Sequence, residues 1–220
     1  MKIKACIFDM DGVIVDTAGH HYGAWRQVAK DLGFDFTPEM NEKLKGISRM
    51  DSLNMMLDLL HAEVAESDKA SLCELKNQHY LGSITDLDHK AILPGIEALL
   101  DELAQLDIKY AIGSASKNAH TVLDLIGLKE RFEVIIDGHS VQYTKPNPEV
   151  FLKAAQGLTV IPAEAIVIED SQKGLEGAVA GGFRAVGIGQ RTNLPSAEVV
   201  FSSLQDVKFH DILEELNRSL

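Results

Sequence analysis

Short, largely apolar segments that end in polar or glycine residues recur along the chain. They are residues 5–8, 109–112, 134–136, 165–168 and 185–188. Continuous runs of this kind are typical of strands in a parallel sheet that is buried on both faces. Stretches with helical periodicity lie between them, for example residues 96–106 and 122–126. The alternation of strand and helix predicts an α/β fold with a doubly wound, mostly parallel, Rossmann-like sheet.

Residues 16–92 interrupt this alternation. Apolar residues there follow a helical spacing, as in residues 25–32 and 53–60, and no strand pattern separates them. An insert of this length directly after the first predicted strand indicates a second, smaller domain. We therefore expect an α/β core domain formed by residues 1–15 and 93–220, and an all-helical cap domain formed by residues 16–92.

The composition argues against several classes of partner. The chain of 220 residues has a net charge of −12 and no block of Lys and Arg, which argues against nucleic-acid binding. It contains no apolar run near the ~18 residues that a membrane span needs. Its two cysteines, Cys6 and Cys73, lack metal-site spacing and favour a reducing compartment. We expect a cytoplasmic protein with small-molecule partners, without nucleic acid or membrane.

Polar clusters follow the predicted strands in chain order. Asp9 and Asp11 end the first segment, Ser114 follows the second, Lys145 comes next, and Glu169-Asp170 end the fourth segment. Ligands of open α/β sheets bind at the carboxyl ends of the strands, so we expect these groups to meet there. Paired carboxylates suit Mg²⁺, and the lysine and hydroxyl suit a phosphoryl group. The pattern predicts a metal-assisted phosphoryl-transfer site.

These clusters resemble the four motifs of the haloacid dehalogenase superfamily. The resemblance rests on residues 8–13, Ser114, Lys145-Pro146 and Glu169-Asp170, and it covers nearly the whole chain, including a helical cap after the first motif. It implies that Asp9 is the nucleophile that forms an aspartyl-phosphate and that Asp11 is the general acid and base. By the same resemblance, the phosphoryl group is held by Ser114, Ala115 and Lys145. Mg²⁺ is held by Asp9, the Asp11 carbonyl, Glu169 and Asp170.

The chemistry of the residues agrees with these implied roles. A carboxylate nucleophile divides one difficult displacement into two easier ones. An acid and base two residues away can protonate the leaving oxygen and later deprotonate the acceptor. The superfamily leaves the acceptor open, because transfer to water makes a phosphatase and transfer to a sugar hydroxyl makes a mutase.

Further polar positions resemble those of the β-phosphoglucomutases, one branch of that superfamily. They include the cap loop at residues 44–49, and the implied substrate-binding residues are Thr17, His21, Trp25, Lys45, Gly46, Arg49, Ser52, Lys76, Ser116, Lys117 and Asn118. Arg49 and residues 116–118 suit a second phosphate. The resemblance implies a monomer that interconverts β-glucose 1-phosphate and glucose 6-phosphate through a bisphosphate that turns around. We also expect His21 to couple cap closure to the use of Asp11.

Three alternatives remain open from the sequence. A sugar-phosphate phosphatase would share the fold, the metal and Asp9. A non-enzymatic sugar-phosphate sensor would be expected to lack Asp9 or Asp11, and both are present. A nucleotide-binding enzyme is suggested faintly by Gly187 and Gly189, but Thr192 stands where a dinucleotide turn needs glycine. The sugar preference also stays open, as does whether the loop at residues 137–144 alters specificity.

Overall fold

The protein is described by a computed structural model that covers residues 2–218. Its centre is a six-stranded sheet in the order β3-β2-β1-β4-β5-β6, with every neighbouring pair parallel. The strands are β1 (Ala5–Phe8), β2 (Lys109–Gly113), β3 (Val134–Ile136), β4 (Ala165–Glu169), β5 (Arg184–Ile188) and β6 (Val199–Phe201). The predicted α/β fold is confirmed. The edge strand β6 was not predicted from the sequence.

Helices cover both faces of the sheet. They are α5 (Ile96–Gln105), α6 (Ala119–Leu125), α7 (Glu149–Gly157), α8 (Gln172–Ala180) and α9 (Phe209–Arg218). Apolar residues of α5, α6 and α9 form one buried cluster with Cys6 and Phe8, and those of α7 and α8 form another with Ala5 and Ile7. Alternate side chains of β1 therefore enter opposite layers. This explains why the strand is apolar at every position.

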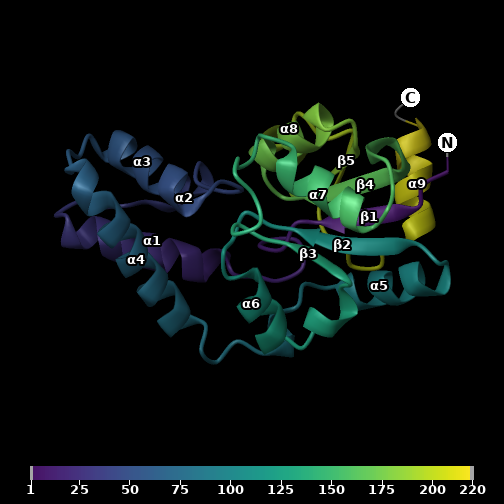
Figure 1. Cartoon of the computed structure of the whole chain (residues 1–220), viewed down its shortest axis with the longest axis horizontal. Coiled ribbons are helices and arrows are strands. Elements are labelled where there is room, and N and C mark those ends of the chain that lie inside the picture. Colours follow the sequence, from purple (N-terminus) through teal and green to yellow (C-terminus); the bar gives the residue numbers. More distant parts are fainter. Residues whose placement is uncertain (1, 219–220) are drawn as a thin grey trace.

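Helices α1 (Ala18–Asp31), α2 (Pro38–Glu42), α3 (Arg49–Leu60) and α4 (Glu66–Ser83) lie together on one side of the sheet (Figure 1). They enclose a buried cluster of their own, which includes Trp25, Leu53, Met56 and Cys73. Tyr80 and Ile84 instead join the cluster of the α/β part. No helix in the described part of the chain is long and apolar enough to span a membrane.

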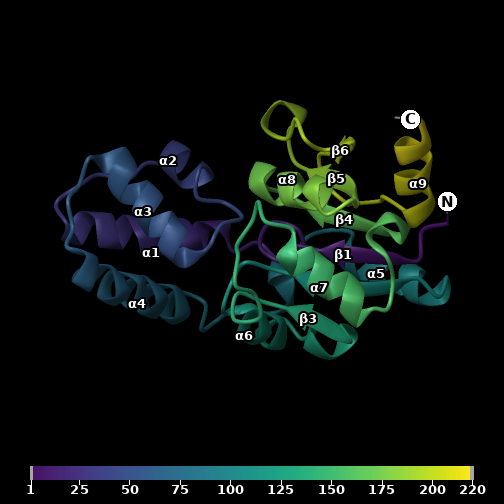
Figure 2. The ribbon, with the colours of Figure 1, turned by 45° about the horizontal axis from the view of Figure 1, so that its top comes forward.

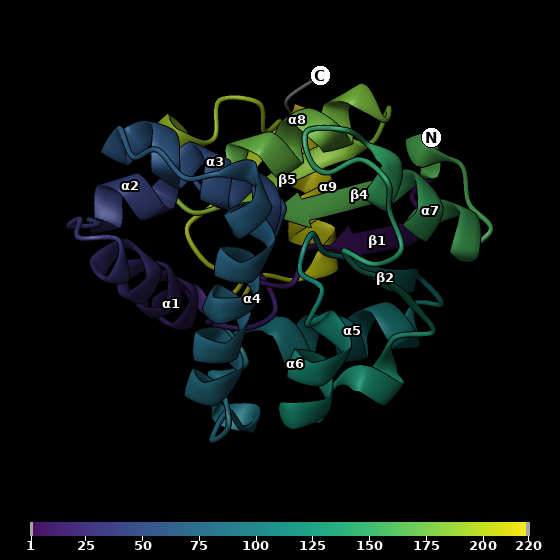
Figure 3. The same ribbon diagram turned by 60° about the vertical axis from the view of Figure 1, so that its left-hand side comes forward.

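The chain enters and leaves this helical insert at adjacent points. Val15 and Ile92 form an antiparallel bridge, and the Leu93 amide donates to the Ile14 carbonyl at 2.9 Å. Strand β1 runs toward the insert, so its carboxyl end faces helices α1–α4 (Figure 2). Figure 3 brings these helices forward, in front of the sheet. The strand ends and the insert thus face one another across a common space.

Candidate active site

A buried ion cluster lies at the carboxyl ends of β1 and β4. Lys145 Nζ is 2.6 Å from Asp9 Oδ1 and 2.7 Å from Glu169 Oε2, and its side chain is fully buried. Burial alone acts to lower the pKa of Lys145, but the charges of Asp9 and Glu169 outweigh burial and raise it. The lysine therefore stays protonated. It holds the Asp9 carboxylate in a fixed position.

Negative charge exceeds positive charge in this cluster. One oxygen from each of Asp9, Glu169 and Asp170 lies within 4.8 Å of the other two. Burial and the charge of Glu169 raise the pKa of Asp9, and the same two causes raise the pKa of Asp170 to about 7. One lysine does not balance three carboxylates. A set of buried carboxylate oxygens with this imbalance fits a hard divalent cation such as Mg²⁺.

Hydrogen bonds orient the acidic pair after β4. Glu169 Oε1 accepts from the Ser171 amide at 3.0 Å and from Ser171 Oγ at 2.9 Å. Glu169 Oε2 is used by Lys145. Gly12 has a φ of +85°, and a Cβ built there would collide with the Asp170 carboxylate. Glycine is therefore required at this position by the close approach of the turn after β1 to Asp170.

Asp11 belongs to a second polar cluster, which extends into the helical insert. Thr17 Oγ1 donates a hydrogen bond to Asp11 Oδ1, and His21 Nε2 lies 3.6 Å from the same oxygen. His21 Nδ1 lies 2.9 Å from Lys76 Nζ. When Lys76 is protonated it donates to Nδ1, which leaves the imidazole proton on Nε2, toward Asp11. The contacts form a continuous path from Lys76 on α4 to Asp11 beside β1.

The pKa values in this second cluster follow from the same contacts. Burial acts to raise the pKa of Asp11, but the contact with His21 and the hydrogen bond from Thr17 outweigh burial, so the pKa is lowered. Burial and the charge of Lys76 lower the pKa of His21. Burial and the nearby Arg49 lower the pKa of Lys76 to about 7. At neutral pH, Asp11 is therefore ionised beside a neutral imidazole.

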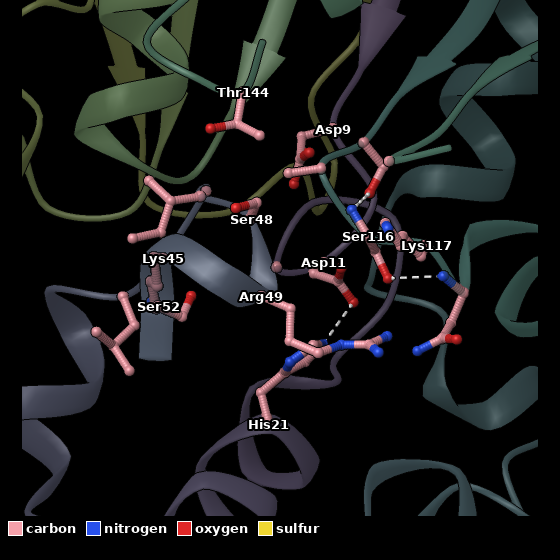
Figure 4. A pocket seen from close by; sticks show the side chains of 18 of the residues that line it. Asp9, Asp11, His21, Lys45, Ser48, Arg49, Ser52, Ser116, Lys117 and Thr144 are labelled. Atoms are coloured by element: carbon pink, nitrogen blue, oxygen red, sulfur yellow. Dashed lines mark hydrogen bonds and ion pairs between the residues drawn. The ribbon is translucent and has the colours of Figure 1, made fainter. Parts of the chain in front are cut away.

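A pocket between the helical insert and the strand ends brings most of the predicted residues together (Figure 4). Its lining includes Asp9, Asp11, His21, Trp25, Lys45, Gly46, Arg49, Ser52, Lys76, Ser114, Ala115, Ser116, Lys117, Asn118 and Asp170. Thr17, Lys145 and Glu169 are absent from the lining. They lie behind it, where they bond to Asp11, Asp9 and the Asp170 amide.

Cationic and amide side chains gather at the Arg49 end of the pocket. Arg49 Nη2 donates to Asn77 Oδ1 at 2.8 Å, and Asn118 Nδ2 donates to the same oxygen at 3.0 Å. Lys117 and Ser116 line the same cavity, and the Asn118 amide donates to Ser116 Oγ at 3.2 Å. Guanidinium, ammonium and amide donors in one place suit an anionic group.

The insert also contacts the acidic cluster directly. Lys45 Nζ lies 3.5 Å from Asp170 Oδ2 and 3.1 Å from Glu42 Oε2. Gly46 has a φ of +75°, and a Cβ built there would collide with Ser171 Oγ. The loop that carries Lys45 and Gly46 is thus pressed against the core. Its lysine brings a positive charge to the carboxylates.

Several lining residues were not among the predicted site residues. They are Gly12, Ala18, Asn41, Leu44, Ile47, Ser48, Gly138 and Thr144. Leu44, Ile47 and Ser48 fall within the cap loop that the sequence singled out. Ser48 also had a signal of its own, because Ser48 and Asp51 have the spacing of a helix N-cap and its third residue. Gly138 and Thr144 fall within the loop at residues 137–144 that the sequence also singled out, whereas Asn41 carries no comparable pattern.

The fold and the carboxylate–lysine cluster define the class of capped α/β enzymes that transfer phosphoryl groups. Residues 6–188 match the haloacid dehalogenase-like hydrolase family, and the chain belongs to that family. This confirms the resemblance found in the sequence. The chain is 38% identical to a β-phosphoglucomutase of Bacillus subtilis (strain 168), over 97% of this chain and 95% of the relative.

Two further comparisons are informative. A crystal structure of β-phosphoglucomutase from Clostridium difficile is 41% identical, covers 98% of each chain and superimposes with a TM-score of 0.92. A phosphorylated carbohydrates phosphatase of Thermotoga maritima (strain ATCC 43589 / DSM 3109 / JCM 10099 / NBRC 100826 / MSB8) is 28% identical, over 99% of this chain and 100% of the relative. Similar chains therefore carry the names of both an isomerase and a hydrolase.

Proposed function

We propose that this enzyme interconverts β-glucose 1-phosphate and glucose 6-phosphate by phosphoryl transfer through Asp9. The observation that carries the proposal is the donor-rich end of the pocket at Arg49, Lys117 and Asn118, apart from the Lys145 cluster. A bisphosphate has two anionic ends, so an enzyme that holds it needs a second anion site. The two relatives named β-phosphoglucomutase support the same assignment.

In the first half-reaction, an Asp9 oxygen attacks the phosphorus of a bound bisphosphate. A bond forms between this oxygen and phosphorus, and the bond from phosphorus to the sugar oxygen breaks. Asp11 gives the departing oxygen the proton that it took from a sugar hydroxyl in the preceding transfer. Lys145 and the Ser114–Ala115 turn hold the phosphoryl oxygens. In the second half-reaction, Asp11 removes a proton from the other sugar hydroxyl, which attacks the aspartyl-phosphate.

The metal site belongs to this proposal. Asp9, the Asp11 carbonyl, Glu169 and Asp170 would hold Mg²⁺, as their oxygen-rich and negatively charged surroundings favour. Bound there, Mg²⁺ would offset charge on the transferring phosphoryl group. Lys45, close to Asp170, adds to this positive charge from the insert.

The remaining predicted site residues are assigned to the sugar phosphate. Arg49, Ser116, Lys117 and Asn118 bind the second phosphate in this proposal. The sugar and the closure of the pocket are assigned to Thr17, His21, Trp25, Lys45, Gly46, Ser52 and Lys76. We further propose that residues 16–92 act as a cap domain that closes on the core of residues 1–15 and 93–220, with the paired crossings near Val15 and Ile92 as the hinge.

The decisive experiment supplies β-glucose 1-phosphate, Mg²⁺ and a trace of glucose 1,6-bisphosphate. Glucose 6-phosphate should accumulate, and little inorganic phosphate should appear. Release of phosphate without glucose 6-phosphate would instead favour a sugar-phosphate phosphatase, the second candidate, which the 28% identical phosphatase supports. Asp9→Asn should abolish both reactions, and an active variant would contradict the covalent mechanism. A cytoplasmic monomer is proposed and is testable by fractionation and by sedimentation.

A further inference from the structure

A side-chain hydrogen bond joins the insert to the loop that carries Lys145. Thr144 Oγ1 donates to Asp51 Oδ2 at 2.7 Å. Asp51 lies in the first turn of α3, whereas Thr144 directly precedes Lys145 in the core. Thr144 lines the pocket together with Ser48, and both are labelled in Figure 4. The bond therefore joins the insert to the core beside the pocket.

The Asp51 side of this bond is fixed by the start of α3. The Asp51 amide donates to Ser48 Oγ at 3.1 Å, and Ser48 Oγ donates to Asp51 Oδ2 at 2.6 Å. Asp51 Oδ2 thus accepts from two hydroxyl groups, one in the insert and one in the core. Arg49 and Ser52 belong to the same turn and line the pocket. The position of Asp51 consequently sets where Arg49 stands.

The Thr144 side is held by its own loop. The amides of Gln142 and Tyr143 donate to Glu149 Oε2 at 2.9 and 2.7 Å, which ties the loop to α7. The Asn147 amide donates to the Thr144 carbonyl at 2.9 Å. Lys145 then reaches Asp9 at 2.6 Å. Two ordered segments meet in this bond, so little chain entropy is lost when it forms.

We propose that Asp51 and Thr144 form a cap latch that positions the Arg49 turn against the Lys145 loop. The inference rests on the proposed function, because it concerns the closed state in which a sugar bisphosphate would turn around. Asp51 and Thr144 are positioning residues. The latch favours the closed state, which keeps water from the phosphoryl group on Asp9. Its loss raises the share of turnovers that end in hydrolysis.

The activity test compares Thr144→Val, which keeps the shape and loses the hydroxyl, with Thr144→Ser, which keeps the hydroxyl. Thr144→Val should lower kcat/KM for glucose 6-phosphate formation about five- to tenfold, the factor expected for one solvent-exposed hydrogen bond. The ratio of inorganic phosphate to glucose 6-phosphate should rise by a similar factor. Thr144→Ser should stay within about twofold of the wild type. Thr192→Val, at an exposed threonine outside the pocket, is the matched control.

A second experiment measures opening of the insert and requires no turnover of a sugar phosphate. Trp25 is the single tryptophan of the chain, lines the pocket and is 2% exposed, so acrylamide quenching of its fluorescence reports opening of the insert. With Mg²⁺ and inorganic phosphate present, Thr144→Val and Asp51→Ala should each increase the quenching constant. The double variant should show no more than Asp51→Ala alone, because both changes remove one bond. Urea unfolding separates this effect from loss of the α3 cap.

The results of these experiments test the latch and the proposed isomerase function separately. Unchanged quenching and an unchanged product ratio in Thr144→Val would overturn the latch. Additive effects of Thr144→Val and Asp51→Ala would also overturn it, since the two residues would then act independently. If the wild type forms no glucose 6-phosphate, the proposed isomerase function fails. The quenching arm would still decide the latch in that case, because it measures opening without the sugar.

Discussion

Lys145 Nζ lies 2.6 Å from Asp9 Oδ1, inside the core and out of contact with water. The same ammonium lies 2.7 Å from Glu169 Oε2. The lysine thus holds two strand ends together and neutralises the proposed nucleophile. The structural role of this residue and its proposed catalytic role rest on the same two contacts, so its replacement tests both.

Lys145→Met should cost both stability and activity. Removing one partner from a buried ion cluster leaves carboxylates without a counter-charge, and such losses are typically about 3–5 kcal/mol of the free energy of unfolding. Activity should fall by about 1,000-fold or more, the scale seen when a main electrostatic group is lost. Urea unfolding and steady-state kinetics measure the two effects.

The control for this prediction is Lys4→Met. Lys4 Nζ is 2.6 Å from Glu164 Oε1, but its side chain is 53% exposed, and a surface pair of this kind contributes about 0–1 kcal/mol. It should leave activity unchanged. Equal losses of stability in the two variants would contradict the view that Lys145 balances a buried charge excess.

His21→Ala should change the fate of the phosphoryl group more than the rate of its formation. His21 connects Lys76 on the insert to Asp11 in the core, so in the proposed mechanism its loss uncouples closure of the insert from the proposed acid and base. We expect the ratio of hydrolysis to transfer to rise about tenfold, equivalent to ~1.4 kcal/mol. His20→Ala is the neighbouring control, because His20 contacts Ser83 within the insert and not Asp11. If the ratio is unchanged in His21→Ala, the coupling role must be abandoned.

The strand-end residues could be located from the sequence because their positions follow from chain direction. A parallel sheet places the carboxyl ends of its strands at one edge, so Asp9, Ser114 and Asp170 had to lie near one another once β1, β2 and β4 were recognised. Each of these residues also ends or directly follows a short apolar segment, which is a distinctive local pattern. The same reasoning predicted a positive charge at Lys145 after β3, but it did not predict that Lys145 would bond both Asp9 and Glu169.

Two of the hydrogen bonds between the insert and the core could not be predicted from the sequence. Asn77 bonds Asn118, and Thr144 bonds Asp51, only because the separately packed insert and core approach one another. No periodicity or local spacing encodes that approach. The buried state of Lys76 was equally hidden, because a single lysine in an amphipathic helix ordinarily faces water.

Lys76 predicts a specific dependence of stability on pH. Burial lowers its pKa to about 7 in the folded protein, from 10.5 for an exposed lysine. Between these two pH values the unfolded chain binds more protons than the folded one, so the contribution of Lys76 to stability rises with pH. From pH 7 to pH 9 the wild type should gain roughly 2 kcal/mol relative to Lys76→Met.

The measurement is urea unfolding of both proteins at several pH values. Lys69→Met is a control in the same helix, since Lys69 pairs with Glu66 near the surface. Its difference from the wild type should be flat over this range. A flat difference for Lys76→Met as well would mean that Lys76 remains charged in the folded protein.

Gly46→Ala should block closure of the insert while leaving the insert folded. The positive φ of +75° imposes a strain of about 1–2 kcal/mol on alanine, and the added methyl group would also collide with Ser171 Oγ in the core.

The control is Gly33→Ala, which introduces the strain of a positive φ without a collision. Its φ is +86°, and among the described residues, apart from Gly33 and its two chain neighbours, no heavy atom lies within 4 Å of a Cβ built there. Gly33→Ala and Gly46→Ala should therefore lose similar amounts of unfolding free energy. Gly46→Ala alone should lose kcat/KM by more than about tenfold, since one buried clash exceeds ~1.4 kcal/mol. Equal kcat/KM in the two variants would show that contact between Gly46 and Ser171 is not needed for turnover.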